Sequence, residues 1–153
     1  MESEQEGRVE RKSGCSRRRQ QRQCIIECLY MWEMQREVPI EALFEAYCDE
    51  KKEDVSSEIL HTDFVIESLR GVINYQDPID VKIRKLAKNW AFERVAKVDL
   101  AILRLAIYEL IFSKKTPVPI IINEALELSK IYSSEDSKRF NNGILDHVAK
   151  EDL

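Results

Sequence analysis

The stretch Val98–Phe112, which reads VDLAILRLAIYELIF, decides the fold of this chain. Its only charged residues are Asp99, Arg104 and Glu109, which are spaced five residues apart and therefore spread around a helix. A helix that is apolar on nearly every side belongs in the middle of a core. Asp99 is placed to act as its N-cap, because a carboxylate there accepts from an otherwise unpaired N–H. We predict a central buried helix that other helices surround.

A membrane span is the competing interpretation of this stretch. A span needs about 20 mostly apolar residues, and this run is shorter and carries charges, so we reject it. A chain of 153 residues is most simply one domain. It buries roughly 68–70% of its surface on folding, which is enough for a core without disulfides or metal. Gly and Pro number only four each, which favours an all-α fold.

Apolar residues at helical spacing recur along the rest of the chain and predict about seven helices. The expected ranges are 16–36, 39–50, 57–75, 77–90, 98–112, 119–132 and 133–150. Asp77 and Pro78 have the pattern of an N-cap followed by a first-turn proline, and 133–136 matches a capping box. Trp90 is expected on the apolar face of its helix. Prolines at 78, 117 and 119 divide the chain into two small bundles around the central helix.

Two glycines fall inside predicted helices. Gly71 costs about 1 kcal/mol relative to Ala unless close packing requires it. Gly143 is expected to mark a close approach between helices.

Charge is distributed unevenly along the chain. Residues 1–23 hold seven Arg or Lys and four Glu, which gives +3, whereas the whole chain carries −4 and the remainder therefore −7. A basic end on an acidic chain indicates contact with a polyanion. Residues 1–15 are polar and without hydrophobic period, which predicts a disordered tail before a single helical domain at 16–153.

The four cysteines are Cys15, Cys24, Cys28 and Cys48, with no CxxC pair among them. Cys24 and Cys28 lie one helical turn apart, and we interpret them as small core residues. No signal or transit peptide is visible, so we expect a reduced, cytoplasmic protein.

Residues that could support catalysis are sparse. His61 and His147 lie on different predicted helices, and neither has the spacing of a metal ligand. The chain has no nucleotide-binding glycine loop and no nucleophile elbow. Glu124 and Glu127 are best interpreted as an exposed pair on a helix surface. We predict no enzyme activity, no metal and no cofactor.

The tract RRRQQRQ at 17–23 is the strongest functional lead. Arginine at a helix N-terminus opposes the helix dipole, so stability alone would favour acidic residues there. The planar arginine fork suits phosphate and stacks on bases. If its four arginines neutralise phosphates of a single strand, log K should fall against log salt with a slope of about −3. A solubilising helix end is the alternative, and charge alone does not choose between them.

The segment SSEDSKRFNNG at 133–143 is the second lead. Lys138 and Arg139 adjoin Phe140, and an aromatic ring beside cations can stack an unpaired base. The alternative is that Phe140 belongs to the core, which its spacing to Ile144 favours. Tyr132 has the same two interpretations.

Several segments taken together resemble the NusB family of bacterial transcription antitermination factors. They are RRRQQRQCIIECLYMWEMQ at 17–35, LRGV at 69–72, VDLAILRLAIYEL at 98–110 and PVPIIINEALELSKIYSSEDSKRFNNGILD at 117–146. The resemblance covers about 16–148. It implies an all-helical fold of two bundles. It also implies binding of single-stranded boxA-type RNA in ribosomal RNA leader transcripts, together with ribosomal protein S10 (NusE). That complex joins RNA polymerase and other Nus factors and suppresses premature termination.

The resemblance also implies roles for particular residues. The arginine-rich RNA-binding tract falls on Arg17, Arg18, Arg19 and Arg22. The second part of the RNA surface falls on Tyr132, Asp136, Ser137, Lys138, Arg139 and Phe140. The S10-facing surface includes Tyr30 and Asp99, and Asp99 can serve as both cap and contact if its two oxygens face different ways.

This chain departs from the family pattern at two places: its tail is longer, and Asn141 replaces a commonly apolar residue. The family's domain also occurs fused to ribosomal RNA cytosine methyltransferases, for which this chain has no room. We therefore expect a non-enzymatic RNA-binding antitermination factor. The alternatives are a helical protein-interaction module without an RNA role and, with least support, an enzyme that uses scattered carboxylates. The sequence leaves open whether the protein forms a homodimer.

Overall fold

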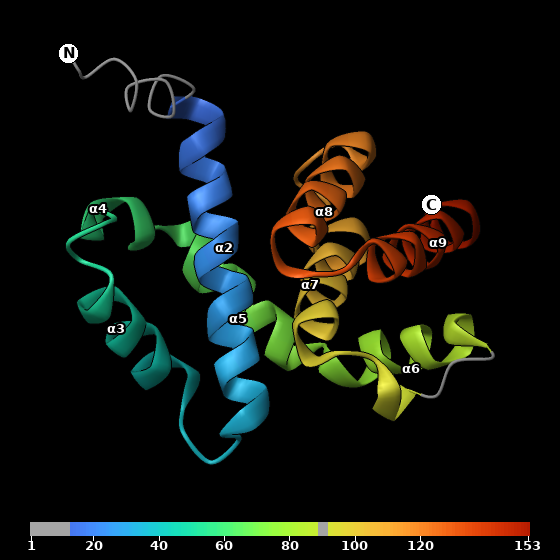
Figure 1. Ribbon diagram of the computed structural model, residues 1–153, viewed down its shortest axis with the longest axis horizontal. Helices are drawn as coiled ribbons and strands as arrows, with labels where there is room; N and C mark the ends of the chain where they lie inside the picture. The colour runs from blue at the N-terminus through green and yellow to red at the C-terminus, as the bar shows by residue number, and fades with distance from the viewer. Residues whose placement is uncertain (1–12, 89–91) are drawn as a thin grey trace.

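The structure of the chain is a computed structural model that describes residues 13–88 and 92–153. Those residues form eight α-helices and no strand, so the predicted all-α fold is confirmed (Figure 1). The helices are α2 (Ser13–Met34), α3 (Ile40–Glu50), α4 (Ser57–Leu60), α5 (Asp63–Asn74), α6 (Gln76–Ala87), α7 (Lys97–Ile107), α8 (Val118–Tyr132) and α9 (Glu135–Asp152). A 3₁₀ turn, η1 (Phe92–Arg94), precedes α7, and a π-helical segment, η2 (Tyr108–Ser113), continues it. None of the helices in these ranges is long and apolar enough to span a bilayer.

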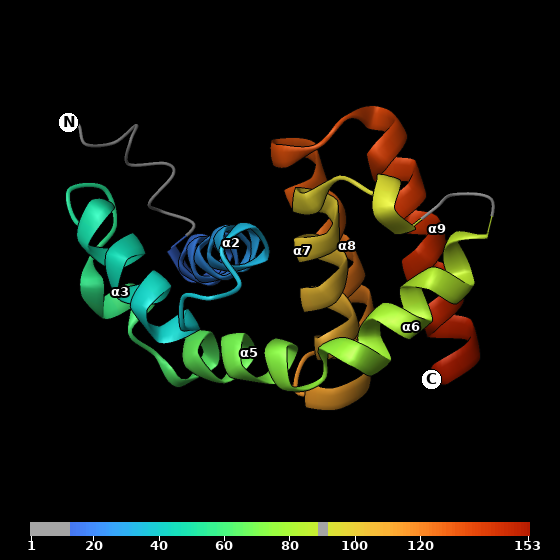
Figure 2. The same cartoon turned by 90° about the horizontal axis from the view of Figure 1, so that it is seen from below.

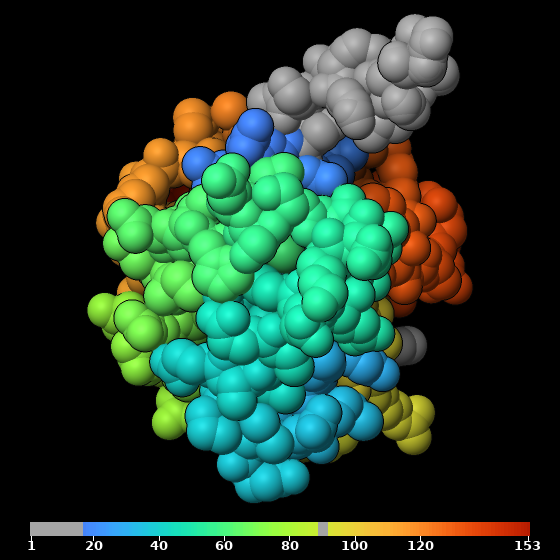
Figure 3. All heavy atoms as spheres, turned by 90° about the vertical axis from the view of Figure 1, so that its left-hand side faces the viewer, coloured from blue at the N-terminus to red at the C-terminus, as the bar shows by residue number. Residues whose placement is uncertain are grey.

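The helices form two small bundles, as predicted. α2 packs with α3, α4 and α5, and α7 packs with α6, α8 and α9. The two bundles meet where α2 lies against α7 (Figures 1 and 2). From the side of α3, α4 and α5, these three helices hide most of α2, and the start of α2 stays visible at the upper edge (Figure 3). The seam between α2 and α7 therefore joins the two halves of the molecule, and the beginning of α2 projects beyond it.

The core centres on α7, which confirms the prediction of a buried central helix. Every residue from Asp99 to Ile107 is buried. The predicted range 98–112 is not one regular α-helix, however, because the backbone widens into η2 after Ile107. Lys114, in the left-handed conformation with φ 55°, ends it.

The three charged residues of the central stretch are all buried and bonded to different elements. Asp99 accepts hydrogen bonds from Ser133 and Asn141 of the α8–α9 region. The predicted N-cap role of Asp99 is wrong: α7 begins two residues earlier, its N-cap is Ala96, and no side chain caps it. Asp99 therefore lies within the first turn, and its oxygens are used for tertiary contacts.

Arg104 joins three helices. Its guanidinium donates two bonds of 2.9 Å to Asp80 of α6 and one of 2.7 Å to Glu33 of α2. Burial alone would raise the pKa of Glu33, but hydrogen bonds from Arg36 and Arg104 lower it. Because each buried charge has a partner, the network avoids the cost of an isolated ion in the core.

Several predicted helix ends differ from those observed. The predicted helix at 57–75 is divided into α4 and α5, because Thr62 adopts an extended conformation and its hydroxyl accepts from the N–H of Val65. Asp77 is not an N-cap, since α5 and α6 meet two residues earlier, at Tyr75, and Asp77 lies in the first turn of α6. The first helix begins at Ser13, inside the range predicted as a tail. Residues 1–12 and Trp90 lie outside the described residues.

The two helical glycines have opposite surroundings. A Cβ added at Gly71 would lie 2.3 Å from ring atoms of Tyr108, so close packing does require glycine there. A Cβ added at Gly143 would meet nothing within 4 Å, so the expected close approach at Gly143 is wrong. The prediction that Cys24 and Cys28 are core residues is confirmed, because both are fully buried free thiols.

Candidate nucleic-acid interface

The four arginines of the tract lie at the start of α2 but in different environments. Arg17 and Arg18 are exposed, and Arg17 forms no ion pair with any of the described residues. The Arg18 guanidinium carbon lies 3.8 Å from the ring centroid of Phe64 on α5, a cation–π contact that orients it. Partial burial, and then the like charge of Arg22, lowers the pKa of Arg18, but arginine stays protonated at neutral pH.

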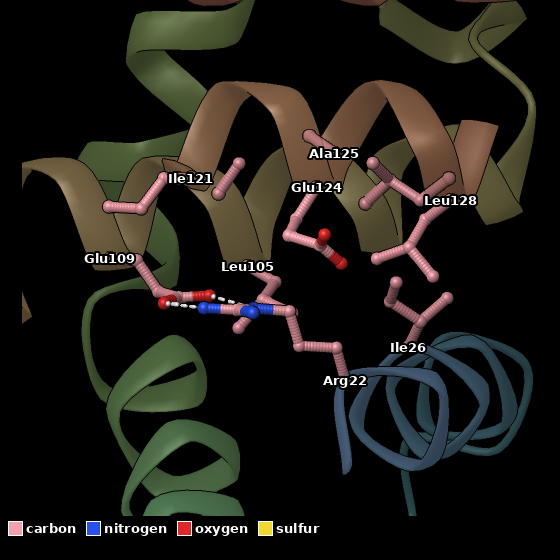
Figure 4. Close-up of a pocket in the computed structure, with 10 residues that line it drawn as sticks. Arg22, Ile26, Leu105, Glu109, Ile121, Glu124, Ala125 and Leu128 are labelled. Atoms are coloured by element: carbon pink, nitrogen blue, oxygen red, sulfur yellow. Dashed lines mark hydrogen bonds and ion pairs between the residues drawn. The ribbon is translucent and has the colours of Figure 1, made fainter. Parts of the chain in front are cut away.

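Arg22 differs from what the sequence led us to expect. Its Nε and one terminal nitrogen donate to the two oxygens of Glu109 at 2.9 and 2.8 Å, and only 4% of Arg22 is exposed. Figure 4 shows it reaching from α2 across the seam to Glu109. A guanidinium held in this way is not available to an RNA phosphate, so we assign Arg22 to the bundle seam rather than to the binding surface.

Arg19 is intermediate between these two cases. It donates to both oxygens of Glu124 on α8 at 3.0 and 2.8 Å, while a third of its side chain stays exposed. Glu124 is therefore not half of an exposed glutamate pair, which corrects our expectation. Glu127 instead pairs with Lys130 at 3.0 Å.

The second lead lies at the corner between α8 and α9. Ser134, one residue later than the capping box predicted, caps α9 by accepting from the N–H of Ser137 at 3.1 Å. Asp136 and Arg139 are exposed and form an ion pair with one another. Ser137, Lys138 and Phe140 are half-buried, and Phe140 packs against the core.

Both leads act on the same side chain of α8, Glu127. A hydrogen bond from Lys130 chiefly lowers the pKa of Glu127, and the charges of Arg19 and Lys138 lower it further. Glu127 is thus within electrostatic range of both the arginine tract and the start of α9. The structure brings together two basic segments that are more than a hundred residues apart, with acidic side chains of α8 between them.

Tyr132 and Tyr30 line one hollow of about 340 Å³ together with Glu27 and Val98. The Tyr132 hydroxyl donates to Glu27 at 2.5 Å, and burial followed by this bond raises the pKa of Tyr132. Tyr30 is 41% exposed. A residue expected to face RNA and a residue expected to face S10 therefore border the same surface.

Asn141 has a role that the sequence did not reveal. Its side chain is fully buried, and its Nδ2 donates to Asp99 at 3.2 Å and to Ser129 at 3.1 Å. Its Oδ1 has no partner among the described residues. Asp99 is only 2% exposed, which leaves little of it for a partner protein. The sequence signal that could have revealed this role is that Ser129 of α8 and Asn141 of α9 are polar residues at positions with the spacing of core residues.

Metal binding finds no support in the described ranges, where no group of three or more His, Cys, Asp and Glu side chains could hold an ion. What these residues offer is exposed guanidinium groups, an aromatic ring beside cations, and hydrogen-bonding side chains at a helix start. Such groups recognise phosphates and unpaired bases.

Comparisons with known proteins give consistent results. Residues 19–150 match the model of the NusB family. Over 134 residues the chain is 39% identical to the transcription antitermination protein NusB of Solibacter usitatus, covering 88% of this chain and 89% of that protein. It superposes on T. maritima NusB with a TM-score of 0.76 at 34% identity, covering 88% and 91% of the two chains.

A further solved structure shows the antitermination factors NusB and NusE in complex with double-stranded RNA. It matches with a TM-score of 0.74 at 25% identity, covering 88% of this chain and 96% of that one. The family match spans most of the chain, the relative is similar along nearly its whole length, and the fold is shared. The chain belongs to the NusB family.

Proposed function

We propose that this protein is a non-enzymatic, cytoplasmic transcription antitermination factor that binds single-stranded boxA-type RNA of ribosomal RNA leader transcripts together with ribosomal protein S10 (NusE). The resulting complex would act on RNA polymerase with other Nus factors. Membership of the family and the solved NusB–NusE–RNA complex support this function. The observation that carries it is the pair of exposed arginines, Arg17 and Arg18, at the start of α2, where the next arginine, Arg19, acts on the same side chain of α8, Glu127, as Lys138 of α9 does.

Phosphates would be held mainly by the start of α2. Arg17 forms no ion pair with a described residue, and Arg18 is oriented by its cation–π contact with Phe64, so neither has to break an ion pair with a described residue to bind a phosphate. Arg19 would reach a phosphate only by sharing its guanidinium with Glu124. We leave Arg22 out of this surface because it is buried with Glu109.

Bases would be read at the start of α9. Lys138 and Arg139 supply positive charge, and Phe140 supplies a ring on which a base can stack. The remaining residues of this surface offer hydrogen-bonding groups: Tyr132, Asp136 and Ser137. S10 would contact the neighbouring hollow at Tyr30.

One observation favours the alternative of a protein-interaction module without an RNA role. Two of the four arginines, Arg19 and Arg22, form bidentate ion pairs within the fold. If Arg17 and Arg18 only keep the helix end soluble, all four arginines of the tract have a role that does not involve RNA.

Fluorescence anisotropy separates the two functions. A labelled boxA-type RNA and a scrambled RNA of the same composition are titrated with the full chain, with and without S10. We expect a preference for boxA that S10 enhances and that Arg17→Ala with Arg18→Ala weakens. Equal, weak binding of both RNAs, unchanged by S10, would contradict the proposal and favour the interaction module.

A further inference from the structure

A second basic segment lies at the end of α6 and continues toward α7. Residues 81–97 hold six Lys or Arg and one Glu, which gives +5 within a chain whose net charge is −4. Three of these cations, Arg84, Lys85 and Lys88, are exposed and lie on one face of the helix end. In contrast to Lys82, which pairs with Asp152 at 3.1 Å, they form no ion pair with any of the described residues. We call Arg84, Lys85 and Lys88 the α6 patch.

The stability of the helix explains only part of the α6 patch. Cations in the last turn complement the helix dipole, and Arg84 and Lys85 lie in the last turn of α6. Lys88 follows them as the C-cap with φ 51°, a conformation that favours glycine because a side chain strains the backbone there. Glycine would end the helix without that strain, so the lysine indicates a use of its charge outside the fold.

The α6 patch continues the surface at the start of α9. The guanidinium carbon of Arg84 lies 4.2 Å from the ring centroid of Phe92, which begins η1. Arg94 ends η1, and it borders one hollow together with Asp136 and Phe140 of α9. Figure 2 shows η1 beside the first turns of α9. A strand that leaves the start of α9 over η1 therefore arrives at the α6 patch.

The composition of this face favours a nucleic-acid backbone over a protein as its ligand. Protein interfaces are enriched in aromatic residues and depleted in lysine. In α6, all of which the structure describes, Val81 is the only large hydrophobic residue that is exposed. Phosphate contacts need no apolar surface, and lysine and arginine supply them without reading the sequence.

We propose that the α6 patch binds phosphates of the RNA that flanks the boxA-type sequence, on the side where the strand leaves the start of α9. The proposal rests on the proposed RNA-binding function and extends it beyond the boxA-type element itself. Because the contacts are to the backbone, they add affinity whatever the sequence of the flank.

A series of RNA lengths tests this surface. A boxA-type RNA, and the same RNA with a run of uridines added at its 5′ or its 3′ end, are titrated with the full chain and S10 by fluorescence anisotropy. We expect one of the two extensions to tighten binding. With three phosphate contacts, it should steepen the slope of log K against log salt by about 2. The gain should therefore shrink about twentyfold from about 50 to about 200 mM salt.

Variants of the α6 patch locate the gain. Replacing Arg84, Lys85 and Lys88 together with Gln should remove the gain and leave the affinity for the unextended RNA unchanged. The matched control replaces Lys51, Lys52 and Arg70 with Gln. It removes the same charge from the ends of α3 and from α5, and it should keep the gain.

A single variant keeps the test independent of any folding defect in the triple variant. Lys88→Gly removes one charge and relieves the positive φ, so the end of α6 should not be weakened. It should nevertheless lower the slope for the extended RNA by about 0.7, the contribution of one phosphate contact on a single strand.

The opposing outcomes are distinct. Equal gains for the α6-patch variant and its control would overturn the proposal and leave these cations to the helix end. Weaker binding of RNA polymerase by the α6-patch variant, with an unaltered gain, would assign the patch to an acidic protein surface and would also overturn it. If the unchanged protein prefers boxA over scrambled RNA but neither extension tightens binding, the α6 patch is refuted and the proposed function stands. Loss of that preference would refute the proposed function itself.

Discussion

The seam between the bundles and the outer surface at the starts of α2 and α9 use the same residue types in opposite ways. In the seam, Arg22 is enclosed with Glu109, and Gly71 makes room for Tyr108. On the outer surface, Arg17 has no ion-pair partner among the described residues, and Gly143 has open space around it. The difference shows that a residue's role in this protein is set by what lies opposite it across the fold.

Breaking the seam should have the largest effect. Arg22→Met leaves Glu109 buried without its cation, and removal of one partner of a buried ion pair costs about 3–5 kcal/mol of unfolding free energy. Urea unfolding measures the loss. Arg17→Met, at the other end of the tract, should change stability by less than about 0.5 kcal/mol.

The double variant Arg22→Met with Glu109→Leu sharpens this test. It replaces the buried charges by apolar groups of similar size, so most of the lost stability should return. If Arg22→Met were as stable as Arg17→Met, the assignment of Arg22 to the seam would be wrong.

The two glycines should respond to alanine with opposite signs. Gly71→Ala overlaps the Tyr108 ring and should destabilise by about 1–3 kcal/mol, as overpacking does. Gly143→Ala meets no neighbour and should stabilise α9 by about 0.5–1 kcal/mol, because alanine loses less entropy in a helix. Thermal unfolding of both variants measures the difference, and a shift in the same direction for both would contradict it.

Substitutions on the outer surface should change the affinity for RNA rather than the stability of the fold. Replacing Arg17 and Arg18 with Ala should reduce the slope of log K against log salt by about 1.4, because each phosphate contact on a single strand contributes about 0.7. The unfolding free energy should change little. Lys52→Ala with Arg70→Ala removes the same charge from elsewhere on the surface and should leave the slope unchanged. Equal slopes for the two double variants would show that the tract makes no local phosphate contact.

The features that the sequence predicted well are those that depend on neighbouring residues. The apolar run at 98–112 had to be buried whatever surrounded it, and the prolines marked the division between bundles. The fate of Arg22 depended on Glu109, which is 87 residues away, and no local pattern indicates that pairing. The break at Thr62 was missed because a single side-chain hydrogen bond, from the N–H of Val65 to the Thr62 hydroxyl, interrupts a helical pattern. The buried amide of Asn141 was missed because its partners, Asp99 and Ser129, are 42 and 12 residues away in the sequence.

Arg19 lies between the two regions, and Glu124→Gln tests which of them it belongs to. Because a third of Arg19 is exposed, loss of this ion pair should cost at most about 1 kcal/mol of stability. If Arg19 also serves the RNA surface, removing the competing carboxylate should tighten RNA binding at low salt, and by more than Glu127→Gln does. Glu127→Gln removes the same charge from the same helix at a carboxylate that pairs with Lys130, so it controls for the general field of α8. Weaker RNA binding by Glu124→Gln would show instead that Glu124 orients Arg19 toward the phosphate, and the ion pair would then belong to the binding surface as well as to the fold.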